Sequence, residues 1–89
     1  GSVSIPNAFT PNADGVNDLW KIGALENYPD AIVTIFDRSG KLVFESSPGY
    51  PEPWDGRYKG EYLPLGTYYY VIRLNEFLEL VNGSLTIIR

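Results

Sequence analysis

The sequence predicts an all-β fold, an Ig-like antiparallel β-sandwich of about seven short strands. Glycine and proline together supply 16 of the 89 residues (9 Gly and 7 Pro) and recur along the whole chain, which leaves no room for a long helix. The segments between them are rich in β-branched and aromatic residues, which favour strands. Many short strands in fewer than ~100 residues are typical of two packed sheets.

The expected strands lie between these turn formers, at residues 3–5, 18–23, 31–37, 41–46, 52–55, 67–74 and 79–88. The third and fourth form a hairpin, because the connection Arg38-Ser39-Gly40 places a glycine where a positive φ is needed. The last two form a second hairpin, connected near residues 75–78. Gly83 is expected to form a bulge, because a turn at Asn82-Gly83 would leave too short a partner strand.

Side chains alternate between the two faces of a strand, so the same pattern predicts the core. Arg73 marks the solvent face of the Tyr-rich strand, and it shares that face with Tyr69 and Val71. The residues expected to point into the core from the last two strands are Tyr68, Tyr70, Ile72, Leu74, Leu85 and Ile87. Trp20 and Trp54 are expected to be core aromatics that join the two sheets.

Composition limits the possible functions. Residues 3–89 are expected to form one small domain, with Gly1-Ser2 as a remnant of cloning. The formal net charge of −4 gives no reason to expect nucleic acid or an anionic membrane as a partner. No apolar run approaches the ~20 residues of a membrane-spanning helix. Because the chain has no Cys and no His, thiolate zinc sites, cysteine nucleophiles and Ser-His-Asp triads are excluded.

The polar loop at residues 10–18 can be interpreted in two ways, and both stay open. Calcium prefers six to eight oxygen ligands on a sharply turning loop, and this loop offers several. The possible calcium ligands are Asn12, Asp14, Val16 through its carbonyl, and Asp18. Alternatively, the Asn and Asp side chains bond their own backbone, and Gly15 supplies a positive φ without any ion.

Catalysis is not expected. Glycosidases, for example, need two carboxyl groups facing each other across roughly 5–10 Å. The candidate pairs, Asp14 with Asp18 and Asp55 with Glu61, lie in Gly- and Pro-rich turns of a chain too short to enclose a deep cleft. We therefore predict no catalytic residues and no enzyme activity.

Several motifs follow one another in a fixed order along the chain. They are Ile5-Pro6-Asn7-Ala8-Phe9-Thr10-Pro11-Asn12 with Asp14-Gly15 and Asn17-Asp18, Ile35-Phe36-Asp37-Arg38 with Gly40, Trp54-Asp55-Gly56, Pro64 with Gly66-Thr67-Tyr68-Tyr69-Tyr70, and Gly83 with Ile87-Ile88-Arg89. Together they resemble the gliding-motility-associated C-terminal domain, the type B sorting domain of the type IX secretion system. Two positions depart from that family: Ser39 stands where an aromatic is usual, and Ala13 where a glycine is usual.

The resemblance implies a non-catalytic C-terminal signal domain that directs a large passenger protein, such as an adhesin, to the cell surface. It implies export through the periplasm and outer membrane, and recognition by a PorP/SprF-like outer-membrane protein. The last strand is the expected recognition element, because in this family it ends the polypeptide at or near Arg89. The residues expected to contact the partner are Arg38, Arg73, Leu85, Ile87, Ile88 and Arg89.

A rival interpretation is an adhesive or carbohydrate-binding Ig-like module of a surface protein. Aromatic rings can stack on sugar faces as they do on other partners. The tyrosines expected in loops are Tyr28, Tyr50, Tyr58 and Tyr62. Solvated or half-buried packing is the simpler explanation for each of these tyrosines taken singly.

Overall fold

The computed structural model describes residues 3–11, 15, 18–75, 77 and 80–88, and it confirms the all-β fold class. The strands are β1 (Ala8–Phe9), β2 (Ile32–Phe36), β3 (Leu42–Glu45), β4 (Arg57–Tyr58), β5 (Glu61–Tyr62), β6 (Gly66–Arg73) and β7 (Leu80–Ile87). Within the described residues, one 3-10 turn, η1 (Leu25–Asn27), is the only helical element.

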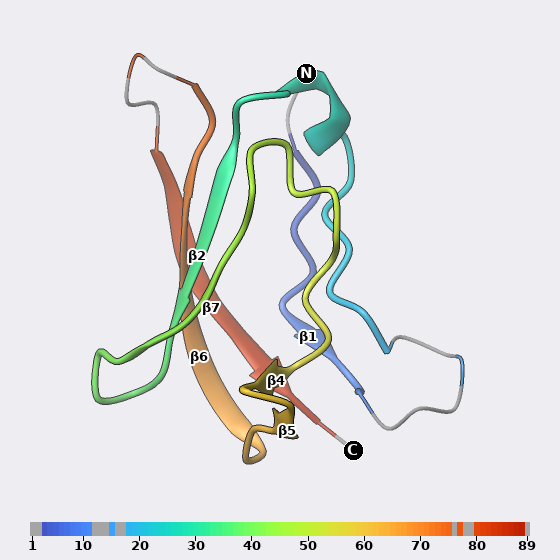
Figure 1. The fold of residues 1–89 in the computed structure, drawn as a ribbon, viewed down its shortest axis with the longest axis vertical. Helices are drawn as coiled ribbons and strands as arrows, with labels where there is room; N and C mark the ends of the chain where they lie inside the picture. The colour runs from blue at the N-terminus through green and yellow to red at the C-terminus, as the bar shows by residue number, and fades with distance from the viewer. Residues whose placement is uncertain (1–2, 12–14, 16–17, 76, 78–79, 89) are drawn as a thin grey trace.

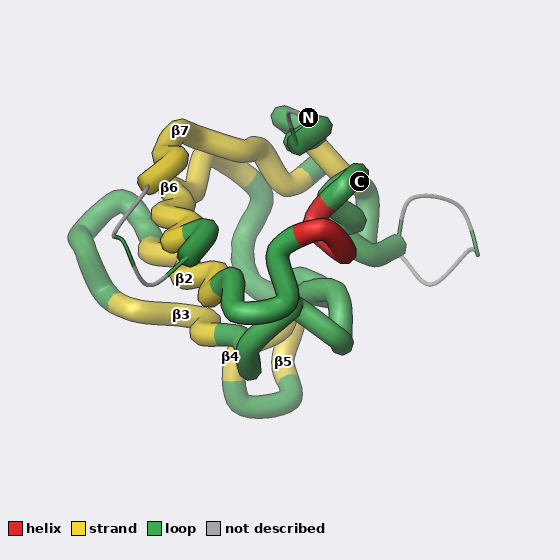
Figure 2. The backbone as a smooth tube through the Cα atoms, turned by 90° about the horizontal axis from the view of Figure 1, so that it is seen from above, coloured by secondary structure: helices red, strands yellow, loops and turns green. Residues whose placement is uncertain are grey.

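Five strands form one sheet in the order β1-β7-β6-β2-β3, and β4 and β5 form a separate hairpin. The large sheet is mixed, because β1 runs parallel to β7 while the other neighbours are antiparallel. This corrects the expectation of a purely antiparallel sandwich. Figures 1 and 2 show the large sheet on one side of the molecule, with long irregular segments passing over its inner face.

Both predicted hairpins are confirmed. β2 pairs with β3 through a turn in which Gly40 has a φ of 89°, and β6 pairs with β7 over their full lengths. The Asp37 carboxylate braces the first turn by accepting hydrogen bonds from the Ser39 hydroxyl at 2.6 Å and the Lys41 amide at 3.0 Å. These two bonds, the hydroxyl first, lower the pKa of Asp37.

Three of the predicted strands are wrong. Residues 3–5, 18–23 and 52–55 make only isolated bridges, Ser4 with Gly23 and Trp20 with Trp54. Proline explains part of this, because Pro6, Pro51 and Pro53 flank or interrupt two of these segments and have no N–H to donate to a ladder. Strands β1, β4 and β5 were not predicted, since a two-residue strand is too short to show an alternating pattern.

The predicted bulge at Gly83 is also wrong. The β6–β7 register runs without a shift from Gly66 opposite Ile87 to Arg73 opposite Leu80, and Gly83 lies opposite Tyr70 within it. A Cβ atom at Gly83 would stand 2.6 Å from the Tyr70 hydroxyl oxygen. The glycine therefore leaves room for the Tyr70 ring, which packs 5.3 Å from the Trp20 ring.

Aromatic residues dominate the core, as the strand pattern predicts. Trp20 and Trp54 are fully buried, and the Trp54 ring contacts those of Phe9, Phe44 and Tyr68 at centroid distances of 5.7 to 6.0 Å. The expected core residues of β6 and β7 are buried or partly buried; they are Tyr68, Tyr70, Ile72, Leu74, Leu85 and Ile87. Their neighbours Tyr69 and Arg73 are exposed, which confirms the assignment of faces.

Tyr50 connects the two tryptophan segments by hydrogen bonds inside the core. Its hydroxyl donates to the Trp20 carbonyl oxygen at 2.5 Å and accepts from the Trp54 amide at 2.8 Å. Tyr50 is buried, and this burial raises the pKa of its hydroxyl. The hydroxyl therefore satisfies two backbone groups that would otherwise be unpaired in a nonpolar surrounding.

We expect Tyr50→Phe to lower the free energy of unfolding at pH 7 by ~1–3 kcal/mol, because it leaves the Trp54 amide and the Trp20 carbonyl unpaired. The substitution should also make the free energy of unfolding fall less steeply as the pH rises above ~10. In the unfolded chain a tyrosine ionises near pH ~10, whereas the folded domain keeps Tyr50 protonated to higher pH. The unfolded state therefore binds fewer protons above pH ~10, and the wild-type domain loses up to ~1.4 kcal/mol per pH unit from this group.

Urea denaturation at several pH values between 8 and 12 would measure this difference. Equal pH slopes for the wild type and Tyr50→Phe would show that Tyr50 does not carry the effect.

Candidate interaction surface

In the polar loop at residues 10–18, the Asp18 side chain braces the backbone at Gly15. The Gly15 amide donates to Asp18 Oδ2 at 2.6 Å, and Gly15 has a φ of 83°, as the self-braced interpretation expects. Asn12, Asp14 and Val16, the other possible calcium ligands, lie outside the described residues. Among the residues that are described, no three acidic side chains come together to hold a metal. Calcium binding at this loop thus stays a prediction.

Calcium is expected to raise the melting temperature of the domain if the loop binds it. A dissociation constant of 10⁻⁴–10⁻³ M, typical of extracellular modules, would give ~1.4–2.7 kcal/mol of added stability at ~10 mM calcium. Thermal melts in excess calcium and in chelator would measure the shift, and Asp18→Asn should remove it. Identical melts in both solutions would leave Asp18 with its bracing role alone.

The end of the last strand is covered by β1. Thr86 donates its amide to the Asn7 carbonyl at 2.9 Å, and Ile88 donates to the Phe9 carbonyl at 3.0 Å. Leu85 and Ile87 are buried in the core, so their side chains are not available to a partner and instead hold β7 in place. Ile88 is 46 % exposed, and Arg89 lies outside the described residues. Of the four predicted contact residues at this end, the structure thus exposes Ile88.

Arg38 and Arg73 are both exposed but lie in different parts of the sheet. Arg38 sits in the β2–β3 turn, at a shallow pocket of about 290 Å³ that is also lined by Leu63, Pro64 and Leu65. Arg73 ends β6 on its solvent face, between Ile32 of β2 and Leu80 of β7. The structure thus does not bring the predicted contact residues into one cluster.

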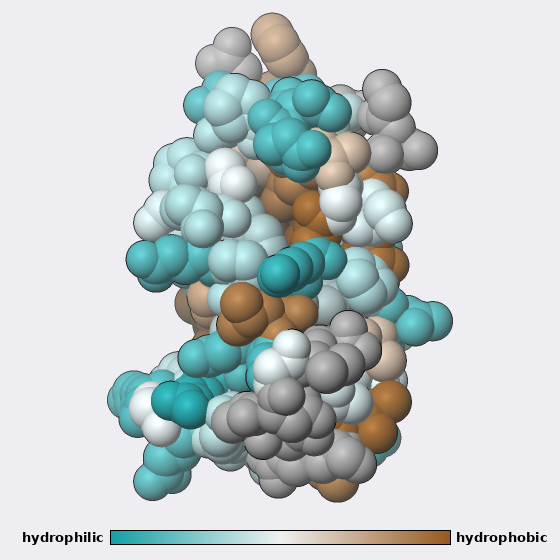
Figure 3. All heavy atoms as spheres, turned by 90° about the vertical axis from the view of Figure 1, so that its right-hand side faces the viewer, coloured by the Kyte–Doolittle hydropathy of each residue, from teal (hydrophilic) through white to brown (hydrophobic). Residues whose placement is uncertain are grey.

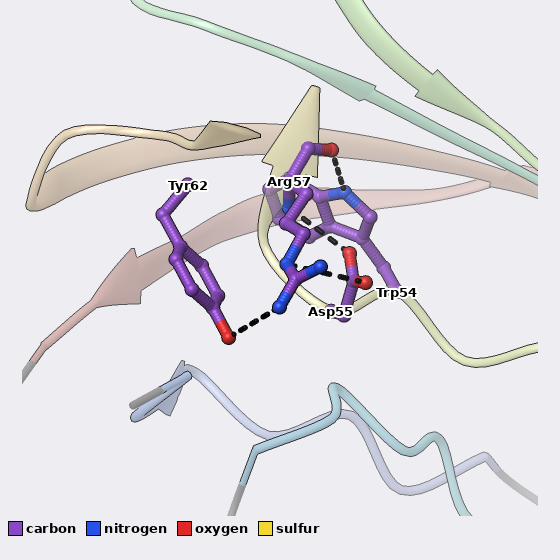
Figure 4. Close-up of polar contacts among 4 residues, drawn as sticks. All are labelled: Trp54, Asp55, Arg57 and Tyr62. Atoms are coloured by element: carbon purple, nitrogen blue, oxygen red, sulfur yellow. Dashed lines mark hydrogen bonds and ion pairs between the residues drawn. The ribbon is translucent and has the colours of Figure 1, made fainter. Parts of the chain in front are cut away.

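The β4–β5 hairpin carries a cluster of cations and aromatic rings that the sequence interpretation missed. Figure 4 shows Arg57 between Asp55 and Tyr62: its guanidinium donates to the Tyr62 hydroxyl at 2.9 Å and lies 3.9 Å from the Asp55 carboxylate. The Trp54 indole N–H donates to the Arg57 carbonyl at 3.1 Å, which ties the hairpin to the core. The sequence Tyr58-Lys59-Gly60-Glu61 could have indicated this hairpin, because the pair Lys59-Gly60 favours a tight turn.

This cluster limits sugar stacking. The Arg57 guanidinium lies 4.4 Å from the Tyr62 ring centroid, and the Lys41 and Lys59 amines lie 4.7 and 5.4 Å from that of Tyr58. Cations over a ring occupy the faces that a sugar would need. Tyr50 is buried, so of the four tyrosines of the rival interpretation three are either out of reach or have a cation over the ring.

The surface on the side of the N-terminal segment is mixed. Figure 3 shows its hydrophobic groups as separate patches between hydrophilic residues. The part of the chain that the structure describes contains no helix long and apolar enough to cross a membrane.

Comparison with known proteins agrees with the fold and with the motifs. The family model of the CHU_C type IX secretion signal domain matches residues 3–87, nearly the whole chain. The chain belongs to this family. The signal domain also shares its fold with part of PorZ, described as an essential bacterial surface component of the type IX secretion system of Porphyromonas gingivalis. The TM-score is 0.60 at 19 % identity, over 99 % of this chain and 11 % of PorZ.

A comparison with curated proteins gives no match. At 19 % identity the PorZ likeness shows the fold alone, and the signal domain spans about a tenth of that chain. Family membership places the signal domain in the type IX secretion system and supports a role as a sorting signal, with export towards the cell surface or the extracellular space.

Proposed function

We propose that the signal domain directs the protein to which it is fused through the type IX secretion system and onto the cell surface. The observation that carries this proposal is the match of the secretion signal family over residues 3–87. The structure agrees with a signal that is recognised after folding, because its motif residues Trp54, Tyr68 and Ile87 are core residues. Their main physical role is to create a shape rather than to touch a partner.

The partner that best fits this role is a PorP/SprF-like protein of the outer membrane. It would bind the folded sandwich through exposed groups, since the core residues are out of its reach. Arg38, Arg73 and Ile88 are the exposed candidates. Arginine is favoured at protein interfaces because its planar guanidinium carries several hydrogen-bond donors. The passenger is a large surface protein, with an adhesin as the expected example.

The test is export of a reporter fused ahead of residues 3–89 in a type IX-competent cell. We expect the reporter in the medium or on the surface, and we expect loss of export when residues 85–89 are deleted. Because Leu85 and Ile87 are core residues, that deletion also removes part of the fold. Arg38→Ala and Arg73→Ala are therefore needed as variants that change exposed groups alone.

A periplasmic reporter that is folded, intact and never exported would contradict the proposal. Binding to a glycan array together with failure of export would favour the carbohydrate-binding interpretation instead.

A further inference from the structure

Among the described residues, none pairs with the outer edge of β7 along the first half of the strand. The Thr86 and Ile88 amides point to β1, and successive residues of a strand point their backbone groups to opposite edges. The backbone amides and carbonyls of Leu80, Asn82 and Ser84 therefore point away from β6, to the same side as those of Thr86. No described residue donates a backbone hydrogen bond to these three groups or accepts one from them on that side. All three residues are exposed, with Leu80 at 58 %. We call these three positions the free edge.

Proline explains why β1 does not begin before Ala8. β1 pairs with β7 only at Ala8 and Phe9, apart from the flanking Asn7 carbonyl. Pro6 has no N–H to continue the ladder, and its carbonyl accepts a hydrogen bond from the Trp20 indole at 2.8 Å. The preceding Ser4 pairs with Gly23 and not with β7. The N-terminal segment therefore joins β7 only at Ala8, beyond the free edge.

The opposite edge of the same sheet is protected in the usual ways. β3 has four residues, a register irregularity against β2, and the charged residues Lys41 and Glu45 at its ends. The first half of β7 has none of these features: residues 80–84 carry no charge and no proline, and their register with β6 is regular. A regular, uncharged, unpaired edge favours the addition of another strand.

We propose that the free edge of β7 receives an extended, uncharged segment of the outer-membrane recognition protein, which adds a strand to the sheet in line with β1. This inference rests on the proposed function and states how the signal is recognised. An extended strand is the occupant that fits, because its backbone groups repeat every second residue, about 6.6–6.8 Å, as do those of the free edge. β1 already shows that this edge accepts a strand in the domain itself.

The neighbouring side chains indicate the chemistry of the segment. Leu80, Asn82 and Ser84 lie on the solvent face beside Arg73, Val71 and Tyr69 of β6, which are their cross-strand partners. Uncharged residues of the segment would pack along this face, because Leu80, Asn82 and Ser84 offer no opposite charge to pair with.

Asn82→Pro is the variant that closes the free edge and spares the fold. The Asn82 N–H points away from β6, so proline removes no hydrogen bond from the β6–β7 ladder. It does remove a donor from the free edge and places its ring where the incoming strand would lie. Asn82→Thr is the matched control, because it changes the same side chain and keeps the N–H.

The readout is export of the reporter fused to residues 3–89, together with the melting temperature of each purified variant. We expect at least tenfold less export for Asn82→Pro than for Asn82→Thr, with both domains folded. If the wild-type fusion is exported and the folded Asn82→Pro fusion is exported equally well, the strand-addition inference is overturned and the proposed function still stands. Absence of export for the wild-type fusion would instead reject the proposed function.

A second measurement needs no variant. Hydrogen exchange of the wild-type domain would be followed with and without a purified PorP/SprF-like protein in detergent. Slower exchange of the Asn82 and Ser84 amides in its presence supports strand addition. Protection confined to other parts of the domain overturns it.

The oligomeric state of the free domain gives a further check. If the wild-type domain forms a homodimer that Asn82→Pro dissociates, a second copy occupies the edge and the inference is overturned.

Discussion

Replacing Trp54 with alanine is expected to remove most of the net stability of the domain at 25 °C. The side chain is 1 % exposed, its ring contacts three other aromatic rings, and its indole N–H bonds the Arg57 carbonyl. Removing a buried tryptophan costs ~3–5 kcal/mol. Small domains lie toward the lower end of the usual ~5–15 kcal/mol of net stability, so this loss consumes most of it.

Circular dichroism during urea denaturation would measure the loss, with Tyr69→Ala as the control. Tyr69 is 45 % exposed on the solvent face of β6, and its truncation should change stability by less than ~1 kcal/mol. The same pair tests how the signal is recognised. If the machinery binds a folded surface, export of the Trp54→Ala fusion should fall in step with its folded fraction, whereas normal export of an unfolded signal would contradict that mechanism.

Gly56→Ala is expected to destabilise the domain by ~2–5 kcal/mol. Gly56 has a φ of 80°, where a side chain costs ~1–2 kcal/mol. It is also buried, and an added Cβ would stand 2.9 Å from Pro11 Cγ and 3.3 Å from Phe9 Cζ. Overpacking of this kind adds ~1–3 kcal/mol.

Gly60→Ala separates the two contributions to that loss. Gly60 has a φ of 86°, close to that of Gly56, but nothing lies within 4 Å of an added Cβ. It should therefore cost only the ~1–2 kcal/mol of backbone strain. Thermal melts of both variants would show the difference, and equal losses would mean that the contact of Gly56 with Pro11 is unimportant.

Local patterns predicted the parts of this fold in which neighbouring residues decide the structure. The hairpin around Gly40 and the hairpin of residues 67–74 with 80–88 each place a glycine or polar turn between alternating strands, and both are confirmed. The faces of β6 followed from Arg73 and period-two alternation alone. The motifs identified the secretion signal family, which the family comparison confirms.

Local patterns failed where the structure depends on contacts between residues that are far apart in the sequence. Trp20 and Trp54 were correctly predicted as core residues, yet the segments around them are not strands, because each makes a single bridge. Gly83 looked like a bulge in its own strand. Its real role depends on Tyr70, thirteen residues away, whose ring needs the space that a Cβ would fill.

For the candidate site, the sequence correctly placed Arg38 and Arg73 on the surface but put Leu85 and Ile87 on both the core list and the contact list. It could not show that β1 covers the end of β7, nor that Pro6 and the Trp20 indole draw the chain away from Leu80, Asn82 and Ser84.

The amino-acid order alone determined the β class, the two long hairpins and the family, because turn geometry and side-chain alternation act over a few residues. Only the folded chain decided which strand edge stays unpaired, because that depends on hydrogen bonds between segments more than 70 residues apart, such as Asn7 with Thr86.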